Sequence, residues 1–385
     1  MNKYNWDFTL LDTGFFRSGQ AFHAGEVHSR ITSCFPPPMS TLQGAIRSAI
    51  ATNRGWRPGN ESDWPKELGD ASSLGQLSLL GPYLIWEGKP LFPAPFNFLI
   101  KRMPGNDSGA RSEVKVSHLI PGDDYPCDLG TPVPLLQKKK KLEGARIPEN
   151  VYLTPLGYQA VSAGKEPPQE EVHFHDCLWS IEERVGLKRS AITRTAKDHY
   201  LYRLGHIRPE RYLKIRVIVC GLPPEWPQPK QQIVPLGGEG RQAAVEIQPV
   251  TSTGSNSIFP SVPKLSPRAG QIQYTVSLIT PFSPGDREGS EKLIQLIKKG
   301  PANAPGECVS ACTGKPCYLG GWDLEKQIPR PQKAFLPPGC TWYFKADAAK
   351  KGMIENLHGG FIENGEDSCY GYGQILIGTW EVDEI

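Results

Sequence analysis

Glycine and proline interrupt this chain so often that it must be rich in loops. Its 385 residues include 40 glycines and 37 prolines, residues that end helices and strands or turn the chain. Hydrophobic residues make up 38% of the sequence, which is low for a compact enzyme. The segments between these breakers have the patterns of short strands and a few helices, and this combination predicts the α+β class.

The first recognisable unit is a strand, a loop and a short helix. Residues 6–17, WDFTLLDTGFFR, are rich in aromatic residues and threonine, as strands are. The prolines at 36–38 prevent a helix from starting earlier, and Ser40 or Thr41 can cap its N-terminus. Apolar residues then recur at helical spacing, so we expect the helix to end near Asn53.

Two domains are expected to meet near residue 225. Residues 211–223, RYLKIRVIVCGLP, read as a strand, and the proline-rich PPEWPQPKQQ indicates the end of a unit. We therefore expect an N-terminal domain at 1–225 and a C-terminal domain at 226–385. Residues 101–150 lose periodicity and contain four consecutive lysines, so we interpret them as an insertion with a mobile, solvated charge run.

Charge and targeting signals restrict the class of protein. The formal net charge of +3 excludes a uniformly basic nucleic-acid coat, so any polyanion site must be local. No apolar run reaches the ~18 residues of a membrane span, and the start MNKYNWDFTLLD is unlike a signal peptide. Nine irregularly spaced cysteines indicate reduced thiols. We expect a cytoplasmic protein with no membrane partner.

Positive charge is concentrated in one segment. Residues 184–216 contain ten lysines and arginines against two acids. We expect AITRTAKDHYLYRL to form a hairpin, with strands at Ala191–Thr195 and Tyr200–Leu204 and a turn at Lys197–Asp198. Its cations can hold phosphates, and its tyrosines can stack on bases at about 1–3 kcal/mol per base. The alternative is an exposed hairpin with solvated cations and tyrosines that pack on the core.

Two glycine-rich segments are candidate phosphate loops. In LGGEGR (236–241) and CYGYGQILIG (369–378), closely spaced glycines let a backbone approach a phosphate, although they also serve tight turns. The second segment leads into a strand-like run, which excludes a dinucleotide-binding fingerprint, and no Walker A motif is present.

Metal and catalytic signals are weak. HFHD (173–176) holds two histidines without a matching ligand cluster. Cys308, Cys312 and Cys317, with Cys340 as a possible fourth, are spaced irregularly, so structural thiols are favoured over zinc.

A general acid or base could come from His23 or His28, in the glycine-containing loop before the first helix. A surface or hydrogen-bonded histidine is the simpler interpretation, and no Ser–His–Asp arrangement is visible. We expect no enzyme activity, no metal and no cofactor.

Six segments in order resemble one family. FPPPMSTLQGAIRSAI, RVGLKRSAITRTAKDHYLYRLGHIR, LGGEGRQAAVE, SLITPF, GGWDLEKQIPRPQKAFLPPGCTWYF and GYGQILIG resemble a RAMP subunit of type III-B CRISPR (Cmr) effector complexes. The resemblance implies two ferredoxin-like (RRM-like) domains and a role in assembly rather than catalysis. It also implies that the partners are the crRNA, whose 5′ tag the subunit clamps, the large polymerase-like subunit and the filament RAMP subunit, with target RNA contacted only indirectly.

The resemblance and the local charge together predict the RNA-binding residues. Where the family often has Arg or Lys beside the last glycines, this sequence has Tyr372 and Gln374, which favours stacking or a turn there. The predicted set is Ser40, Thr41, Arg47, Lys188, Arg189, Arg194, Tyr200, Tyr202, Arg203, Gly237, Gly238, Arg241, Gly371, Tyr372 and Gly373.

Two other functions are compatible with the sequence. A RAMP-type endoribonuclease that processes CRISPR repeat RNA would use His23 or His28. A purely structural assembly module would turn its basic hairpin toward an acidic protein.

Overall fold

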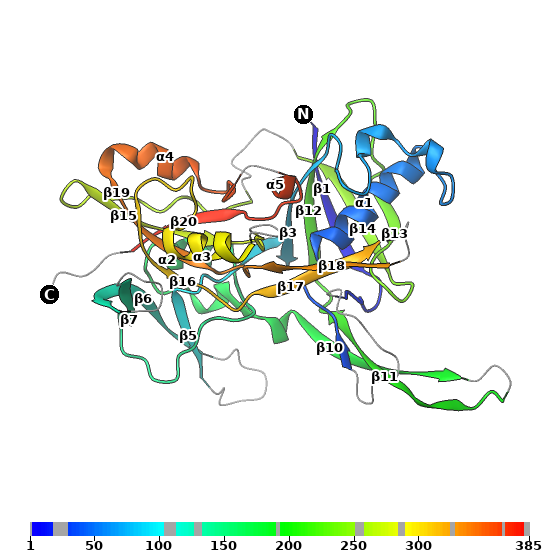
Figure 1. Cartoon of the computed structure of the whole chain (residues 1–385), viewed down its shortest axis with the longest axis horizontal. Helices are drawn as coiled ribbons and strands as arrows, with labels where there is room; N and C mark the ends of the chain where they lie inside the picture. The colour runs from blue at the N-terminus through cyan, green and yellow to red at the C-terminus, as the bar shows by residue number, and fades with distance from the viewer. Residues whose placement is uncertain are drawn as a thin grey trace.

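Strands dominate the molecule. The computed structural model describes residues 2–17, 30–103, 113–126, 133–189, 193–250, 258–283, 289–323, 328–363 and 366–380. Within these residues the strands form an eight-stranded sheet, a four-stranded sheet and three smaller ones, with few helices (Figure 1). The predicted α+β class is confirmed.

The eight-stranded sheet has the order β13-β14-β1-β12-β3-β4-β8-β9. Its members are β1 (Asn2–Leu10), β3 (Ser78–Trp86), β4 (Lys89–Pro93), β8 (Val151–Leu153), β9 (Val172–Phe174), β12 (Leu213–Leu222), β13 (Gln231–Pro235) and β14 (Gln242–Pro249). β1 pairs antiparallel with β12 on one side and with β14 on the other. Because side chains alternate between faces, Trp6 lies in one buried row with Val217 and Ile247.

One face of this sheet is covered by α1 (Met39–Asn53), which confirms the predicted helix. Leu42, Ile46 and Ile50 recur at helical spacing and are almost completely buried against Trp6 and Phe8. This packing makes the helix and the sheet one core.

The start of α1 differs from the prediction. Pro38 is the N-cap, and neither Ser40 nor Thr41 caps the helix through its side chain. The N–H groups of Thr41 and Leu42 both bond the Pro38 carbonyl, at 2.9 and 3.2 Å, so the backbone closes the first turn by itself.

The four-stranded sheet is built from the C-terminal part of the chain. Its order is β16-β19-β15-β20, with β15 (Gln271–Leu278), β16 (Glu307–Cys312), β19 (Thr341–Asp347) and β20 (Ile375–Thr379). α3 (Gly289–Lys299) lies between β15 and β16, and α4 (Lys351–Asn356) and α5 (Glu366–Cys369) lie between β19 and β20. Tyr274 stacks on Phe344 at 5.2 Å in its core.

The two main sheets share a buried boundary. Tyr83 and Ile218 of the first sheet belong to one hydrophobic cluster with Leu376 of β20. The Tyr83 hydroxyl donates a hydrogen bond to the Gln374 side chain, which is completely buried. Both apolar packing and a polar bond therefore connect the sheets.

The predicted insertion at 101–150 contains regular structure. β5 (Phe98–Arg102), β6 (Val114–Tyr125) and β7 (Val133–Lys138) form a three-stranded sheet, and α2 (Pro155–Ser162) follows. The absence of periodicity misled the prediction because the register shifts between Pro121 and Asp124, which interrupts the alternation along β6. The lysines at 138–141 are exposed, as predicted.

The predicted boundary near residue 225 falls between β12 and β13. Both strands belong to the eight-stranded sheet, because the chain returns through β13 and β14 to pair with β1. Sheet membership changes between Pro249 and Gln271. No helix in the described residues is long and apolar enough to span a membrane.

Candidate nucleic-acid interface

The predicted basic hairpin is present and is longer than expected. β10 (Trp179–Arg189) and β11 (Ala196–Pro209) pair antiparallel, and the short β2 (Arg30–Thr32) runs parallel to β11. Figure 1 shows this hairpin extending away from the two main sheets. We call residues 179–209 the arm.

β10 ends at Arg189 and β11 begins at Ala196, so the predicted turn at Lys197–Asp198 is wrong. Those two residues belong to β11, because pairing with β10 continues to Ala196. Arg194 has a φ of +57°, a left-handed conformation that non-glycine residues adopt mainly in turns.

Six predicted RNA-binding residues lie on the arm: Lys188, Arg189, Arg194, Tyr200, Tyr202 and Arg203. The side chains of Lys188, Arg189 and Tyr200 lie outside the described part of the structure, whereas Arg194 and Arg203 are exposed. Between residues 186 and 204 the chain carries five lysines and arginines against one acid, a formal net charge of +4.

Tyr202 lies over the opposite strand of the arm. It is the cross-strand partner of Gly186, where an added Cβ would be 2.3 Å from the tyrosine Cζ atom. A ring this close needs a glycine beneath it. Tyr202 therefore packs on the arm itself and is partly exposed.

The base of the arm carries paired charges. Arg184 Nη2 and Arg208 Nη2 both lie 3.1 Å from the carboxylate of Asp12, just after β1. Arg241, from the turn between β13 and β14, places Nη1 2.9 Å from the same carboxylate. Glu182 accepts from Nε of Arg184 at 2.9 Å and of Arg208 at 2.5 Å. We call Arg184, Arg208 and Arg241 the arginine triad.

Arginines of the triad lower the pKa values of Glu182 and Asp12. Hydrogen bonds from Arg208 and Arg184 hold the pKa of Glu182 below its usual value. For Asp12, desolvation acts in the opposite direction, but the hydrogen bond from Arg184 and the charge of Arg208 still lower the pKa. Both carboxyl groups are therefore ionised at neutral pH.

A buried histidine lies beside the triad. His206 is 1% exposed, lies 3.2 Å from Thr13 Oγ1 through its Nδ1, and stacks on Phe15 at 4.9 Å. Burial, together with the charges of Arg184 and Arg241, lowers the pKa of His206. The imidazole is neutral at physiological pH.

Gly237 and Gly238 form a turn against the chain after β1. The Gly238 N–H donates to the Phe15 carbonyl at 2.9 Å, and a Cβ on Gly237 would be 2.5 Å from the same oxygen. With a φ of +82°, Gly237 also needs the freedom of glycine. These glycines place Arg241 beside the arm.

The predicted phosphate site at the start of α1 is covered. The Tyr372 hydroxyl lies beside the backbone of Ser40, and a Cβ on Gly321 would be 3.9 Å from Ser40 Oγ. Gly321 belongs to the hairpin of β17 (Cys317–Asp323) and β18 (Ile328–Phe335). In Figure 1 this hairpin runs beside α1. Thr41 is only partly exposed.

Arg47 is a packing residue in this structure. It is 7% exposed and donates to Gln43 at 2.9 Å and to the Asp70 carbonyl at 2.6 Å. Its guanidinium lies over the ring of Trp64 at 5.5 Å. The predicted phosphate contact of Arg47 is inconsistent with this burial.

The C-terminal glycine segment joins the two main sheets. A Cβ on Gly371 would be 2.9 Å from the carbonyls of Leu79 and Gly81 in β3, and the Gly373 N–H donates to Pro281. The ring of Tyr372 lies 5.1 Å from Phe335, and burial raises its pKa. Packing explains these residues without a bound phosphate.

The predicted residues therefore form two groups. The arm and the turn that carries Arg241 meet at one charged surface, whereas the start of α1 and the C-terminal glycines meet inside the molecule. Asp12, Arg184 and Arg208 were missing from the predicted set. Two of them lay within the basic segment, but only the fold reveals that they share a carboxylate.

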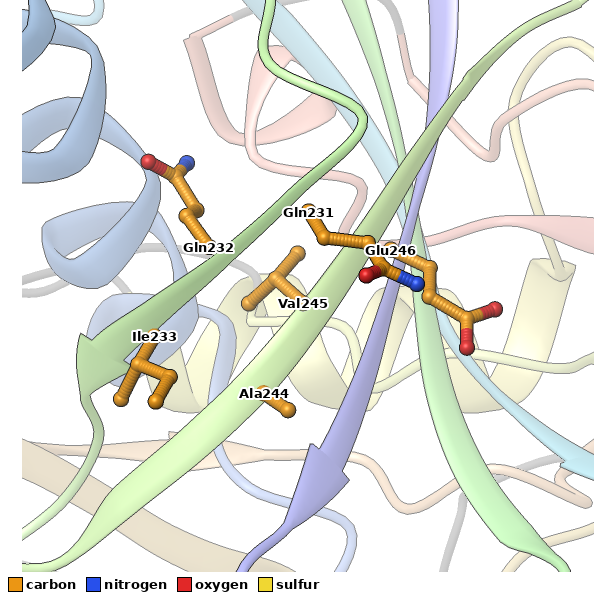
Figure 2. A pocket seen from close by; sticks show the side chains of 6 residues that line it. All are labelled: Gln231, Gln232, Ile233, Ala244, Val245 and Glu246. Carbon is orange, nitrogen blue, oxygen red and sulfur yellow. The ribbon is translucent and has the colours of Figure 1, made fainter.

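The alternative sites gain no support from the described residues. His23 and His28 lie outside them. No group of three potential metal ligands occurs among them, and burial raises the pKa of Cys308 to about 12 and of Cys312 to about 11. A pocket of about 250 Å³ lies over β13 and β14 and is lined by Gln231, Gln232, Ile233, Ala244, Val245 and Glu246 (Figure 2).

Comparison with known proteins places the chain in a class. The model of one family, described as CRISPR-associated protein (Cas_Cmr3), matches residues 6–380. The chain is thus a CRISPR-associated protein. It belongs to the Cas_Cmr3 family, which confirms the predicted type III-B Cmr subunit. No curated protein matches.

Chains in solved structures of type III complexes match this chain over most of its length. A chain of type III-B Cmr-β bound to cognate target RNA is 15% identical with a TM-score of 0.49, covering 96% of each chain. A second, from Cmr-β bound to cognate target RNA and AMPPnP, is 14% identical with a TM-score of 0.47, covering 92% of this chain and 88% of the other. A chain of the Csm3–Csm4 subcomplex of type III-A is 11% identical with a TM-score of 0.38, covering 99% and 100%.

Proposed function

We propose that this protein is a non-catalytic RNA-binding subunit of a type III-B CRISPR effector complex. It clamps the 5′ tag of crRNA, docks the large polymerase-like subunit and contacts the filament RAMP subunit. The observation that carries the proposal is the arm, which has a formal net charge of +4 between residues 186 and 204 in a chain of net charge +3. A local cationic surface of this kind suits a polyanion.

The charged residues of the sheet support the arm as the RNA-binding element. On the face of the first sheet opposite α1, Arg216 bonds Asp7 through two contacts of 2.6 Å. Lys214 pairs with Glu246 on the same face at 2.9 Å. Paired charges cancel and leave little attraction for phosphates. RNA is therefore expected along the arm rather than across the sheet.

Strand order supports two ferredoxin-like units. In the C-terminal sheet the chain follows a β-α-β-β-α-β path, with β15 and β19 central and β16 and β20 at the edges. In the first sheet β14-β1-β12-β3 has the same relative order, and α1 connects β1 to β3. No helix connects β12 to β14 in this fully described stretch, so the first unit is the less regular one.

The experiment removes three cations of the arm together. Arg189, Arg194 and Arg203 are replaced by alanine, and binding of a 5′-tagged crRNA is measured by fluorescence anisotropy over a range of salt concentrations. Each lost phosphate contact lowers the slope of log affinity against log salt by ~0.7 for single strands, so a decrease of about 2 is expected.

The matched control removes equal charge elsewhere. Lys264, Lys299 and Lys350 are exposed and lie outside the arm; their triple alanine variant is expected to retain the wild-type slope. Equal losses in both variants would show that only net charge matters, and unchanged binding in the arm variant would refute the proposal. Incubation with crRNA should leave the RNA intact.

A further inference from the structure

Three arginines from two separate parts of the chain meet one carboxylate beside the arm. Arg184 and Arg208 come from the arm, Arg241 from the β13–β14 turn, and all three contact Asp12 within 3.1 Å. With Glu182 included, three guanidinium groups face two carboxylates. This cluster keeps one excess positive charge after all its ion pairs have formed.

The two acids have different positions in the cluster. Glu182 accepts from Nε of both arm arginines, at 2.9 and 2.5 Å, and so fixes the planes of these two guanidinium groups. Asp12 alone also reaches Arg241, and its side chain is 48% exposed. Asp12 can therefore leave while Glu182 keeps Arg184 and Arg208 oriented.

Arg241 retains an unused donor. Its side chain is 20% exposed, and its Nε is buried without a hydrogen-bond partner. Asp12 accepts only from Nη1 of this residue. An RNA backbone phosphate carries two charged oxygens, which can accept from Nε and Nη of one guanidinium together. The cluster therefore offers a phosphate more than Asp12 uses.

We propose that the arginine triad is a binding site for one RNA backbone phosphate and that Asp12 occupies it as an internal counter-ion in the free protein. This inference rests on the proposed function, because the phosphate belongs to RNA bound along the arm. An entering phosphate replaces the carboxylate of Asp12, so an anion always balances the positive charge of the triad. Asp12 thereby weakens non-specific attraction until RNA is positioned by the arm.

The test uses substitutions with opposite expected signs. Binding of a fluorescein-labelled single-stranded RNA to the full chain is compared among wild type, Asp12→Asn, Arg241→Gln and the double variant. Asp12→Asn is expected to tighten binding about three- to tenfold, since it removes a competing charge. Arg241→Gln is expected to weaken it about tenfold. The double variant should bind more tightly than Arg241→Gln alone, because Asp12 also pairs with Arg184 and Arg208.

Glu355→Gln is the matched control. It removes an acid from a half-exposed pair with Lys351 on α4, which lies far from the arm in Figure 1, and should leave binding unchanged. If Asp12→Asn weakens binding as Arg241→Gln does, Asp12 is only a structural tie and the inference is overturned. If Asp12→Asn fails to fold, an Arg241→Gln salt slope equal to that of wild type overturns it.

The two proposals fail in different ways. If wild type and the arm triple variant bind RNA equally, the proposed function itself is wrong. If the arm variant loses binding while Asp12→Asn matches Glu355→Gln, only the phosphate site at the triad is wrong.

Discussion

At the residue scale, the protonation of His206 depends on the contacts made where the arm meets the segment after β1. Its ring is buried between Phe15 and Thr13, and Arg184 and Arg241 face it, with Glu182 and Glu239 as the nearby acids. Burial and the arginines favour the neutral imidazole. A proton on this ring would add a fourth cation beside Arg184, Arg208 and Arg241.

We therefore expect stability to depend on pH through His206. The folded pKa lies below the ordinary 6.5, so the unfolded chain binds more protons there and stability falls as pH decreases below that value. One histidine contributes a slope of at most about 1.4 kcal/mol per pH unit. Urea unfolding at a series of pH values should show a smaller slope in His206→Gln than in wild type. An unchanged slope would mean that His206 is protonated when folded.

The contacts of Arg47 could not be predicted from the sequence. A cation after a helix start resembles a phosphate ligand, but its position is decided by Asp70 and Trp64, which approach from the segment after the helix. Arg241, a predicted RNA-binding residue, lies in the charged cluster beside the arm. Its partner Asp12 is 229 positions away in the chain, and local pattern contains no information about such pairs.

At the scale of elements, local sequence patterns predicted the approximate positions of the first helix and of the hairpin. α1 lies where apolar spacing predicted it. The arm was predicted from alternation and charge, but its turn was misplaced because several polar residues near the tip suit a turn equally well. The packing of the β17–β18 hairpin beside α1 was not predicted, because Gly321 of the hairpin and Ser40 of the helix are distant in sequence.

The turn between β13 and β14 allows a prediction with a close control. Gly237→Ala places a methyl group 2.5 Å from the Phe15 carbonyl at a φ of +82°, whereas Gly240→Ala meets nothing within 4 Å at a φ of +64°. Gly240→Ala should cost about 1 kcal/mol of unfolding free energy from the left-handed backbone alone. Gly237→Ala should cost about 3 kcal/mol, because a backbone carbonyl must also move. Equal losses in urea unfolding would show that the turn does not pack on Phe15.

At the scale of the whole molecule, composition was enough for the α+β class but not for the pairing of distant segments. Strands on both sides of residue 225 share a sheet because β14 returns to β1, and no local signal marks that return. The sheet of β5, β6 and β7 was not predicted because a register shift interrupts the alternation of side chains along β6. At the C-terminal glycines, where the sequence favours stacking or a turn over a phosphate contact, Gly371 approaches β3 closely.

The buried boundary between the two main sheets contains a side-chain hydrogen bond whose contribution to stability can be measured. Tyr83 of the first sheet donates its hydroxyl to Gln374 in front of β20, and the Gln374 side chain has no exposure to solvent. Tyr83→Phe keeps the ring but leaves a buried amide oxygen without this donor, at a cost of about 1–3 kcal/mol. Tyr152→Phe removes a hydroxyl from a buried ring within the first sheet and should cost less. In a double-mutant cycle with Gln374→Ala, a coupling near zero would mean that apolar packing alone joins the two sheets, whereas a coupling of about 1 kcal/mol or more assigns the hydroxyl–amide bond a direct part in holding them together.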